Sequence, residues 1–313
     1  MRILVLGGSG FVGRSIAELA AARGDDVTVL NRGRADPPPR VRALTGDRQT
    51  PGGLDALGDA TWDAVVDTWS ADATVVAAAA TALQGRAGHY TYISSRSVYV
   101  LGEDRLVPHD EPGYAGDKLR GELAAAGFGG PLLLARAGLI LGPYENIGRL
   151  PWWLNRLHAG GPTLAPGPRD LPLQYIDTRD LAAFVLDAAA TARTGPFDLV
   201  SPPGHTTMGE LLDITNEVTG NHADLRWTDP DTIIAAGIQP WTHLPVWLPP
   251  GPLHTALHGS DVTPALAAGL RCRPVRETIT DTWTWLTSLP DGAPHRADRP
   301  AVGLDPQIEA TLL

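Results

Sequence analysis

The fold is decided by residues 2–13, which read Arg2-Ile3-Leu4-Val5-Leu6-Gly7-Gly8-Ser9-Gly10-Phe11-Val12-Gly13. The run 2–6 is apolar without interruption after its first residue, which predicts a strand buried on both faces. Helical spacing of apolar residues follows over 11–23. A strand, a glycine turn and a helix in this order predict a pyrophosphate site, because glycine lets the backbone approach closely and the helix amides attract negative charge.

The glycines match two known spacings. Gly7, Gly10 and Gly13 give GxxGxxG, and Gly8, Gly10 and Gly13 give GxGxxG. We expect Gly7, Gly10 and Gly13 to bind a dinucleotide together with Phe11 and Val12, which open the helix. A structural turn in another kind of α/β protein is the alternative, and the strand before and helix after the loop disfavour it.

The same alternation continues along the chain. Strands are predicted at 26–30, 63–67, 89–93 and 132–136, with helices at 71–83 and 115–126. Alternating strands and helices favour right-handed parallel units and hence an α/β Rossmann fold with a doubly wound parallel sheet. Ligands of such sheets bind at the carboxyl ends of the strands.

The second half of the chain is less regular. Segment 144–172 is rich in Trp, Pro and Gly, whereas 173–177 and 196–200 resemble strands returning to the sheet, with a helix at 178–192 between them. Two further helices are expected near 207–219 and 275–288. The expected organisation is a dinucleotide-binding domain (1–143 and 173–201), a smaller C-terminal substrate lobe (144–172 and 202–290) and a peripheral tail (291–313).

Composition excludes several classes of function. The 313 residues carry a net charge of −10, which argues against sequence-independent nucleic-acid binding and against anionic membrane surfaces. No apolar run approaches the roughly 18 residues of a membrane span, and the N-terminus enters a strand without a signal-peptide pattern. The single cysteine, Cys272, suits a reducing compartment. We expect a cytoplasmic, bacterial protein acting on a small molecule.

The end of the second strand bears on cofactor choice. NAD enzymes usually place an acid there to bind the ribose 2′-hydroxyl, but this chain has Asn31, Arg32, Gly33 and Arg34. Two arginines can pair with a 2′-phosphate, which favours NADP over NAD, although solvated loop charges are the alternative. Asp47, taken to end the third strand, is placed to meet the adenine amino group.

A catalytic pattern follows two later elements. Ser95 stands at the end of a predicted central strand, and Tyr114 and Lys118 lie one turn apart on a predicted helix. An ammonium near a phenol favours the phenolate, so such a pair can exchange a proton with an alcohol or carbonyl near neutral pH. Lys118 is the only lysine among 25 basic residues, which makes a functional position more credible than a solvated one.

These motifs together resemble the extended short-chain dehydrogenase/reductases, in the broad group of NAD(P)-dependent epimerases, dehydratases and reductases. The resemblance covers almost the whole chain. It implies that Tyr114 is the acid/base, that Lys118 also binds the nicotinamide ribose and that Ser95 orients the substrate oxygen. It is carried by Gly7, Gly10 and Gly13, by Ser94-Ser95, by Tyr114 and Lys118, by Arg136 with Gly142-Pro143, and by residues 176–182.

Several positions depart from the family pattern. Asp67-Thr68-Trp69-Ser70 replaces a His-Leu-Ala-Ala-like segment, and Arg96 and Ser97 replace the acidic pair of sugar 4,6-dehydratases. The sequence therefore resembles a divergent branch, which is also similar to chloroplast stem-loop-binding proteins. The resemblance further implies a homodimer formed through the helix of Lys118, with Leu119 and Leu123 as candidate contacts.

Four residues are candidates for substrate contact, namely Trp69, Arg96, Tyr144 and Trp152. Aromatic rings stack on sugars and Arg96 can bind an anion, whereas packing and solvation are the plainer explanations. No metal is expected, because no His, Cys or Asp cluster has ligand spacing.

The expected function is an NADP-linked reductase or dehydrogenase, with NAD as the other cofactor possibility. One alternative is a sugar-nucleotide epimerase that retains NAD. Another is a non-catalytic protein that binds RNA or senses NADP.

Overall fold

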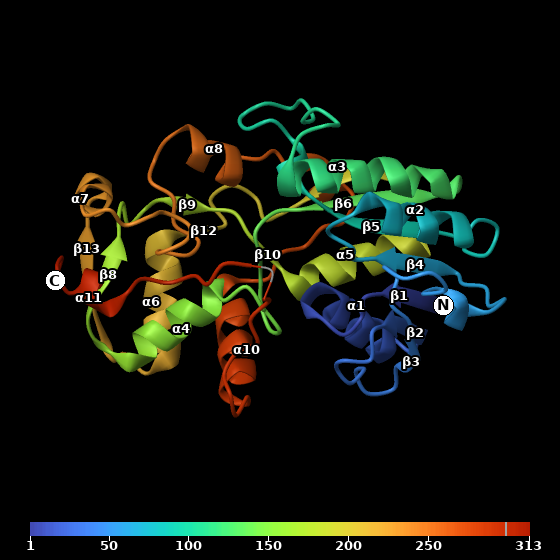
Figure 1. Cartoon of the computed structure of the whole chain (residues 1–313). Helices are drawn as coiled ribbons and strands as arrows, with labels where there is room; N and C mark the ends of the chain where they lie inside the picture. Colours follow the sequence, from blue (N-terminus) through green and yellow to red (C-terminus); the bar gives the residue numbers. More distant parts are fainter. Residues whose placement is uncertain (298) are drawn as a thin grey trace. The chain divides into compact units, whose positions relative to one another are not determined.

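The computed structural model describes residues 1–297 and 299–313 and divides the chain into two compact units (Figure 1). Unit 1 comprises Met1–Gly138, Thr178–Leu199 and Val262–Arg271, and unit 2 comprises Leu139–Asp177, Val200–Asp261 and Cys272–Leu313. Each unit has its own apolar core.

Unit 1 is built on a seven-stranded sheet in the order β11-β6-β5-β4-β1-β2-β3, with every neighbouring pair parallel. This confirms the α/β Rossmann fold with its doubly wound parallel sheet. In β1 residues 3–6 are fully buried, as the uninterrupted apolar run predicted, and β4 and β5 are buried as well. The strands are β1 (Arg2–Leu6), β2 (Asp26–Asn31), β3 (Arg42–Thr45), β4 (Ala64–Asp67), β5 (Tyr90–Ser95), β6 (Leu132–Ala137) and β11 (Gly195–Leu199).

Helices cover both faces of this sheet (Figure 1). On one face α1 (Phe11–Ala22) packs against α5 (Thr178–Ala190), and on the other α2 (Ala73–Ala82) packs against α3 (Gly113–Ala125). Unit 1 also contains α9 (Thr263–Ala267), which contacts β11, and the short turns η1 (Asp55–Leu57), η2 (Arg96–Val98) and η3 (Ala126–Phe128). Small residues on the buried sides of α1 and α2 let these helices lie close to the strands.

Unit 2 packs α4 (Arg149–Ala159), α6 (Met208–Thr219) and α10 (Val275–Thr287) around a core that includes Trp153 and Trp247. Both indole N–H groups are satisfied, because Trp153 donates to the Pro245 carbonyl at 2.7 Å and Trp247 to the Gly167 carbonyl at 2.9 Å. Three strand pairs complete it: β7 (Ile140–Leu141) with β10 (Ile176–Asp177), β9 (Pro172–Leu173) with β12 (Thr206–Thr207), and β8 (Gly161–Pro166) with β13 (Ala223–Thr228). The short helices are α7 (Pro230–Ala235), α8 (Pro252–His258) and α11 (Pro306–Glu309).

The expectation that 173–177 returns to the main sheet is wrong. Its residues form parts of the short strands β9 and β10, which pair with β12 and β7. Gln174 lies between them with its amide donating to the Ser201 and Ser260 carbonyls, so its side chain ties together loops of unit 2. Of the two returning segments only β11 joins the sheet, beside β6.

The outer boundaries also differ from those expected. Segment 139–143 belongs to unit 2, whereas 262–271 belongs to unit 1. The last residues are not a peripheral tail. Leu304 is part of the core of unit 2, and the buried Glu309 pairs with Arg156 at 2.8 Å. Leu304 and Glu309 are thus fixed by tertiary contacts, which cannot be predicted from the local sequence pattern.

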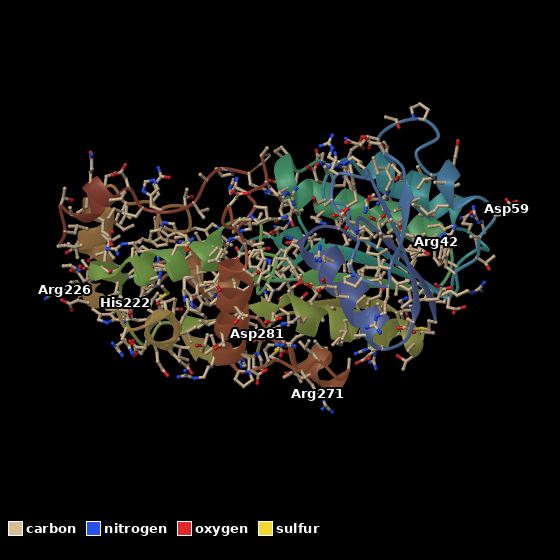
Figure 2. All side chains as sticks on the ribbon, turned by 90° about the horizontal axis from the view of Figure 1, so that it is seen from below. Arg42, Asp59, His222, Arg226, Arg271 and Asp281 are labelled. Carbon is tan, nitrogen blue, oxygen red and sulfur yellow. The ribbon has the colours of Figure 1, made fainter. Side chains whose placement is uncertain are left out.

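Charged side chains such as Arg42 and Asp59 in unit 1 and Arg226 in unit 2 are exposed (Figure 2). The charged side chains that are buried are therefore the informative ones, because burying a charge is costly unless it is paired. Several of them gather near the carboxyl ends of β4, β5 and β6, where a doubly wound sheet binds its ligands.

Candidate active site

The glycine loop joins β1 to α1 and is held by close backbone contacts. Gly7 has a φ of +99°, and its N–H donates to the Leu30 carbonyl at 2.9 Å. A Cβ at Gly7 would overlap the Thr68 hydroxyl, and one at Gly13 would overlap the Gly7 carbonyl. Glycine is therefore required at both places by the turn itself.

Gly10 has a different role. It is the N-cap of α1, no side chain of the described residues caps that helix, and a Cβ added at Gly10 would meet no described atom within 4 Å. Phe11 and Val12, both half-buried, form the first turn behind it. Uncapped amides at a helix N-terminus with open space in front of them suit an anionic group such as a pyrophosphate.

The end of β2 also presents an unused donor. The Asn31 side-chain oxygen accepts a hydrogen bond from the Gly33 N–H at 2.8 Å, which leaves the buried Asn31 Nδ2 without a partner in the described chain. Arg32 and Arg34 are exposed, and no described group bonds to either. A hydroxyl or phosphate oxygen of a nucleotide would satisfy the Asn31 amide. The glycine loop and Asn31 together fit a dinucleotide.

Asp47 lies two residues beyond β3, which ends at Thr45, so the expectation that it ends this strand is wrong. Its carboxylate accepts a hydrogen bond from the Gln49 N–H at 3.1 Å and its carbonyl accepts one from Thr50, so the chain turns at this point. Contact of Asp47 with an adenine stays a prediction.

The catalytic candidates come from β5 and α3. Ser95 ends β5, and its hydroxyl accepts from the Ser97 N–H and donates to the Ser97 hydroxyl, both at 3.1 Å. Tyr114 and Lys118 lie one turn apart on α3, with Tyr114 37% exposed and Lys118 only 3% exposed. The spacing of one turn on a helix is the one that the sequence predicted, and the structure adds that the phenol is accessible and the ammonium buried.

Lys118 contacts two carbonyls and an aromatic ring. Its Nζ donates to the Ile93 carbonyl at 2.6 Å and to the Trp69 carbonyl at 2.8 Å, and it lies 4.8 Å from the centre of the Tyr92 ring. Two carbonyls and a ring face all favour the charged form of an amine. The structure thus brings the ends of β4 and β5 together on the one lysine of the chain.

Two glycines that the sequence reasoning missed set the position of α3. A Cβ at Gly116 would overlap the Glu111 carbonyl, and one at Gly121 would overlap the Tyr92 hydroxyl. The missing side chain of Gly121 lets α3 lie close to β5, from which the Ile93 carbonyl accepts the Lys118 hydrogen bond, whereas Gly116 makes room for the chain that enters α3. Glycines inside a helix that also carries a catalytic motif were the available signal.

A buried ion pair is connected to Lys118 through Trp69. Arg48 makes a bidentate pair with Asp67, with both N···O distances at 2.7 Å and side chains 6% and 0% exposed. Asp67 also accepts from the Tyr90 hydroxyl at 2.7 Å and the Trp69 N–H at 2.9 Å. Burial alone would raise the pKa of Asp67, but the Arg48 charge and these hydrogen bonds outweigh it and lower the pKa. The sequence reasoning noted Asp67 as a departure and missed Arg48.

Another buried pair joins α3 to β6. The Arg136 guanidinium donates to both Glu122 carboxylate oxygens, at 2.9 and 2.7 Å, and the Ser94 hydroxyl donates to Glu122 at 2.6 Å. These contacts fix α3 against the end of β5. Arg136, one of the residues that carry the family resemblance, therefore has a structural role in this pair.

Arg96 does not present an unpaired charge. Its Nε lies 3.3 Å from the Asp198 carboxylate, which also accepts from the Tyr99 hydroxyl at 3.1 Å. Burial raises the pKa of Asp198, and the Arg96 charge and the Tyr99 hydrogen bond partly offset it. A substrate anion would have to compete with this carboxylate, which weakens the prediction that Arg96 binds substrate.

The aromatic candidates have defined surroundings. Trp69 donates its Nε1–H to the Asp72 carbonyl at 2.9 Å, in unit 1. In unit 2, Tyr144 packs edge-on against Trp285 at 5.7 Å and Trp152 against Trp153 at 4.6 Å. Trp152 is therefore part of the packing of its unit, and substrate contact by these three residues stays a prediction.

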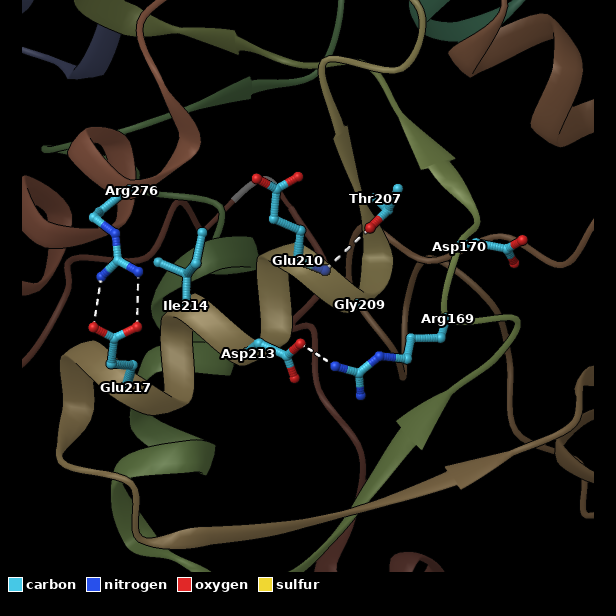
Figure 3. Close-up of a pocket in the computed structure, with 9 residues that line it drawn as sticks. All are labelled: Arg169, Asp170, Thr207, Gly209, Glu210, Asp213, Ile214, Glu217 and Arg276. Atoms are coloured by element: carbon cyan, nitrogen blue, oxygen red, sulfur yellow. Dashed lines mark hydrogen bonds and ion pairs between the residues drawn. The ribbon is translucent and has the colours of Figure 1, made fainter.

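A surface depression on unit 2 lies over the start of α6 (Figure 3). Two ion pairs line it, Arg276 with Glu217 and Arg169 with Asp213. The charges of these four residues are already neutralised by each other. It is lined by Arg169, Asp170, Thr207, Gly209, Glu210, Asp213, Ile214, Glu217 and Arg276.

Among residues 1–297 and 299–313 no group of three or more His, Cys, Asp or Glu side chains is placed to hold a metal ion. The helices in these ranges are too short or too polar to cross a membrane. Leu119 is 5% exposed and so packs inside unit 1, whereas Leu123 is 59% exposed. A dimer contact through Leu119 would need this side chain at the surface, so that part of the dimer prediction is wrong.

Comparison with known proteins agrees with this geometry. Residues 3–93 match the model of the NAD dependent epimerase/dehydratase family. The matched residues include the strand, glycine loop and helix described above. No curated protein matches the chain in sequence.

Solved structures share the fold of this chain over nearly its whole length. The Bordetella bronchiseptica enzyme WbmF, solved with NAD+, is 18% identical with a TM-score of 0.68, over 92% of each chain. UDP-N-acetylglucosamine 4-epimerase from Bacillus cereus is 15% identical with a TM-score of 0.66, over 91% of this chain and 98% of that chain. UDP-glucose 4-epimerase from Thermus thermophilus, solved with NAD, is 20% identical with a TM-score of 0.63, over 91% and 99%.

Proposed function

We propose that this chain is an NAD-dependent epimerase of a nucleotide-linked sugar, which oxidises a substrate carbon and reduces it again without net change of cofactor. The observation that carries the proposal is the buried Lys118 ammonium one helical turn from the accessible Tyr114 phenol, close to the end of β5. The names of the three similar structures, two of which are UDP-sugar 4-epimerases, favour this reaction over a net reduction.

The dinucleotide would be held by the glycine loop and the end of β2. Gly10 and the first amides of α1 suit the pyrophosphate, and the Asn31 amide suits a ribose oxygen. When bound, the nicotinamide supplies and accepts the hydride. Lys118 would bind the nicotinamide ribose with its ammonium, whose position is fixed by the Ile93 and Trp69 carbonyls.

Three residues would handle the substrate proton. Tyr114 removes the proton of the substrate hydroxyl at its phenol oxygen and returns it after the carbon is reduced. Lys118, buried one turn along the helix, stabilises the phenolate charge that Tyr114 carries before it takes this proton and again after it returns it. The Ser95 hydroxyl, at the end of β5, hydrogen-bonds the same substrate oxygen and fixes its direction.

The test is a screen of UDP-sugars with the purified protein, followed by separation of products and by the absorbance of reduced nicotinamide. We expect epimers to form at catalytic amounts of protein with no accumulation of reduced cofactor. Denaturing the protein should release bound NAD. Tyr114→Phe should lower turnover by about 10²- to 10⁴-fold, whereas the matched change of an exposed arginine in unit 2, Arg226→Gln, should keep the parent turnover. Net consumption of reduced cofactor in proportion to product would refute an epimerase.

A second candidate is an NADP-linked reductase, and Arg32 and Arg34 favour it. Both are exposed at the end of β2, where a 2′-phosphate would lie, and no acid occupies that place. Titration with NADPH and NADH separates the two candidates. Tighter binding of NADPH, together with stoichiometric reduction of a carbonyl substrate, would favour the reductase.

A further inference from the structure

The Arg48–Asp67 pair of unit 1 is buried on both sides, at 6% and 0% exposure. Arg48 comes from the turn after β3, and Asp67 is the last residue of β4. Arg48 also donates to the Val75 carbonyl at 3.2 Å, so the guanidinium connects three segments. A pair this buried is weak evidence for stability, because apolar side chains of similar volume often serve a protein equally well.

Asp67 is hydrogen-bonded to Trp69, the residue whose carbonyl accepts a hydrogen bond from Lys118. One carboxylate oxygen accepts from the Trp69 N–H at 2.9 Å, and the carbonyl of the same Trp69 accepts from Lys118 Nζ at 2.8 Å. The Arg48 guanidinium also lies 5.6 Å from the centre of the Trp69 ring. Both charges of the pair therefore act on Trp69, one through its amide and one through its indole.

We propose that Arg48 and Asp67 are positioning residues for Lys118, because they fix the Trp69 carbonyl that accepts a hydrogen bond from the lysine ammonium. This inference rests on the observed contacts of the pair. Only the catalytic role of Lys118 rests on the proposed function. A positioned ammonium keeps its place beside Tyr114 with little reorganisation when a ligand binds.

Other charges near this lysine have to be kept constant in a test. Lys118 lies over the Tyr92 ring, and the groups that act electrostatically on Tyr92 are Asp67, Tyr114, Glu122 and Arg48. A change of Asp67 or Arg48 alone would alter this field as well as the position of Trp69. Removing both charges together leaves the net charge unchanged and keeps the change of this field smaller than the loss of one charge would.

The single lysine makes the measurement direct. Labelling with lysine carrying ¹³C at Cε gives one resonance, that of Lys118, whose titration with pH is followed by NMR in the absence of added dinucleotide. The test variant is Arg48→Met/Asp67→Leu/Tyr90→Phe, in which Tyr90→Phe removes the hydroxyl that would lose its acceptor. Tyr90→Phe alone is one control. Arg156→Met/Glu309→Leu, which removes a pair of like kind from unit 2, is the other.

In the triple variant the Trp69 carbonyl is no longer held, and the titration midpoint of Lys118 is expected to fall by about one pH unit, because the charged amine loses part of one hydrogen bond. Both controls should keep the parent midpoint. An unchanged midpoint in the folded triple variant would overturn the proposal.

If the triple variant does not fold, Asp67→Glu serves instead, because it conserves the charge and displaces the carboxylate by one methylene. The same fall is expected, and an unchanged midpoint again overturns the proposal. Since the resonance is read without cofactor or substrate, failure of the proposed epimerase activity would leave this result standing. A lowered midpoint without any dinucleotide binding would reject the proposed function alone.

Discussion

Raising the pH from 4.5 to 7 should destabilise unit 2 through one buried carboxyl group, that of Glu145. This side chain is 0% exposed and accepts hydrogen bonds from the Arg149 N–H at 2.7 Å and the Leu150 N–H at 3.1 Å, at the start of α4. Burial raises the pKa of Glu145 from 4.5 to about 7, against the opposing effects of the Arg149 charge and the two amides.

The direction follows from proton linkage. The folded pKa lies above the unfolded value, so the unfolded chain releases this proton at lower pH than the folded one. The contribution of Glu145 to stability is therefore complete below about 4.5, decreases up to about 7 and stays constant above that. The gap between the two values corresponds to about 3 kcal/mol, since each pH unit is worth about 1.4 kcal/mol.

The assay is urea unfolding at a series of pH values, with Glu145→Gln as the matched variant. Glutamine keeps an acceptor for one amide, loses the other hydrogen bond and does not titrate, so its cost is a constant offset of about 1–3 kcal/mol. Burial lowers the pKa of His89, which gives a slope of opposite sign, but both proteins share it and it cancels in the difference. The prediction is refuted if the difference in free energy of unfolding between parent and Glu145→Gln stays constant with pH, or if it grows in favour of the parent as the pH rises.

Three further predictions concern the proposed active site. Tyr114→Phe should lower kcat by about 10²- to 10⁴-fold in a turnover assay while the melting temperature stays unchanged, because the hydroxyl belongs to a side chain that is 37% exposed; retained kcat would contradict its role. Gly10→Ala should fold normally and bind dinucleotide more weakly by calorimetry, since its Cβ meets no described atom, whereas Gly13→Ala overlaps the Gly7 carbonyl and should unfold at lower urea. Equal dinucleotide affinity of Gly10→Ala and parent would argue against a pyrophosphate there. Arg32→Ala/Arg34→Ala should leave NADH affinity unchanged and reduce that for NADPH about tenfold or more, and an equal loss for both would exclude 2′-phosphate recognition.

Local patterns were sufficient for most of unit 1. The uninterrupted apolar strands and the glycine loop predicted β1, α1 and the parallel sheet, and the observed bounds of α1, α3 and α5 lie within about two residues of the expected ones. A pattern within ten or fifteen residues is enough here, because a strand buried on both faces and an amphipathic helix each leave their own periodicity.

Short segments were less predictable. Segment 173–177 has the composition of a buried strand, and in the structure it contributes to two two-residue strands of unit 2. The choice depends on where Ser201 and Ser260 return to meet Gln174, at sequence separations of 27 and 86 residues. Nothing within the segment records that choice.

The sequence by itself determined the glycine loop, the Tyr114 and Lys118 spacing and the parallel fold that places them at strand ends. Tertiary structure alone decided what surrounds Lys118: the Trp69 carbonyl lies 49 residues away, and the Arg48 that secures it pairs across 19 residues with Asp67. The reason is physical. Periodicity reflects which face of one element is buried, whereas the partner of a buried charge is set by the folding of distant segments into contact, and burial makes that partner obligatory.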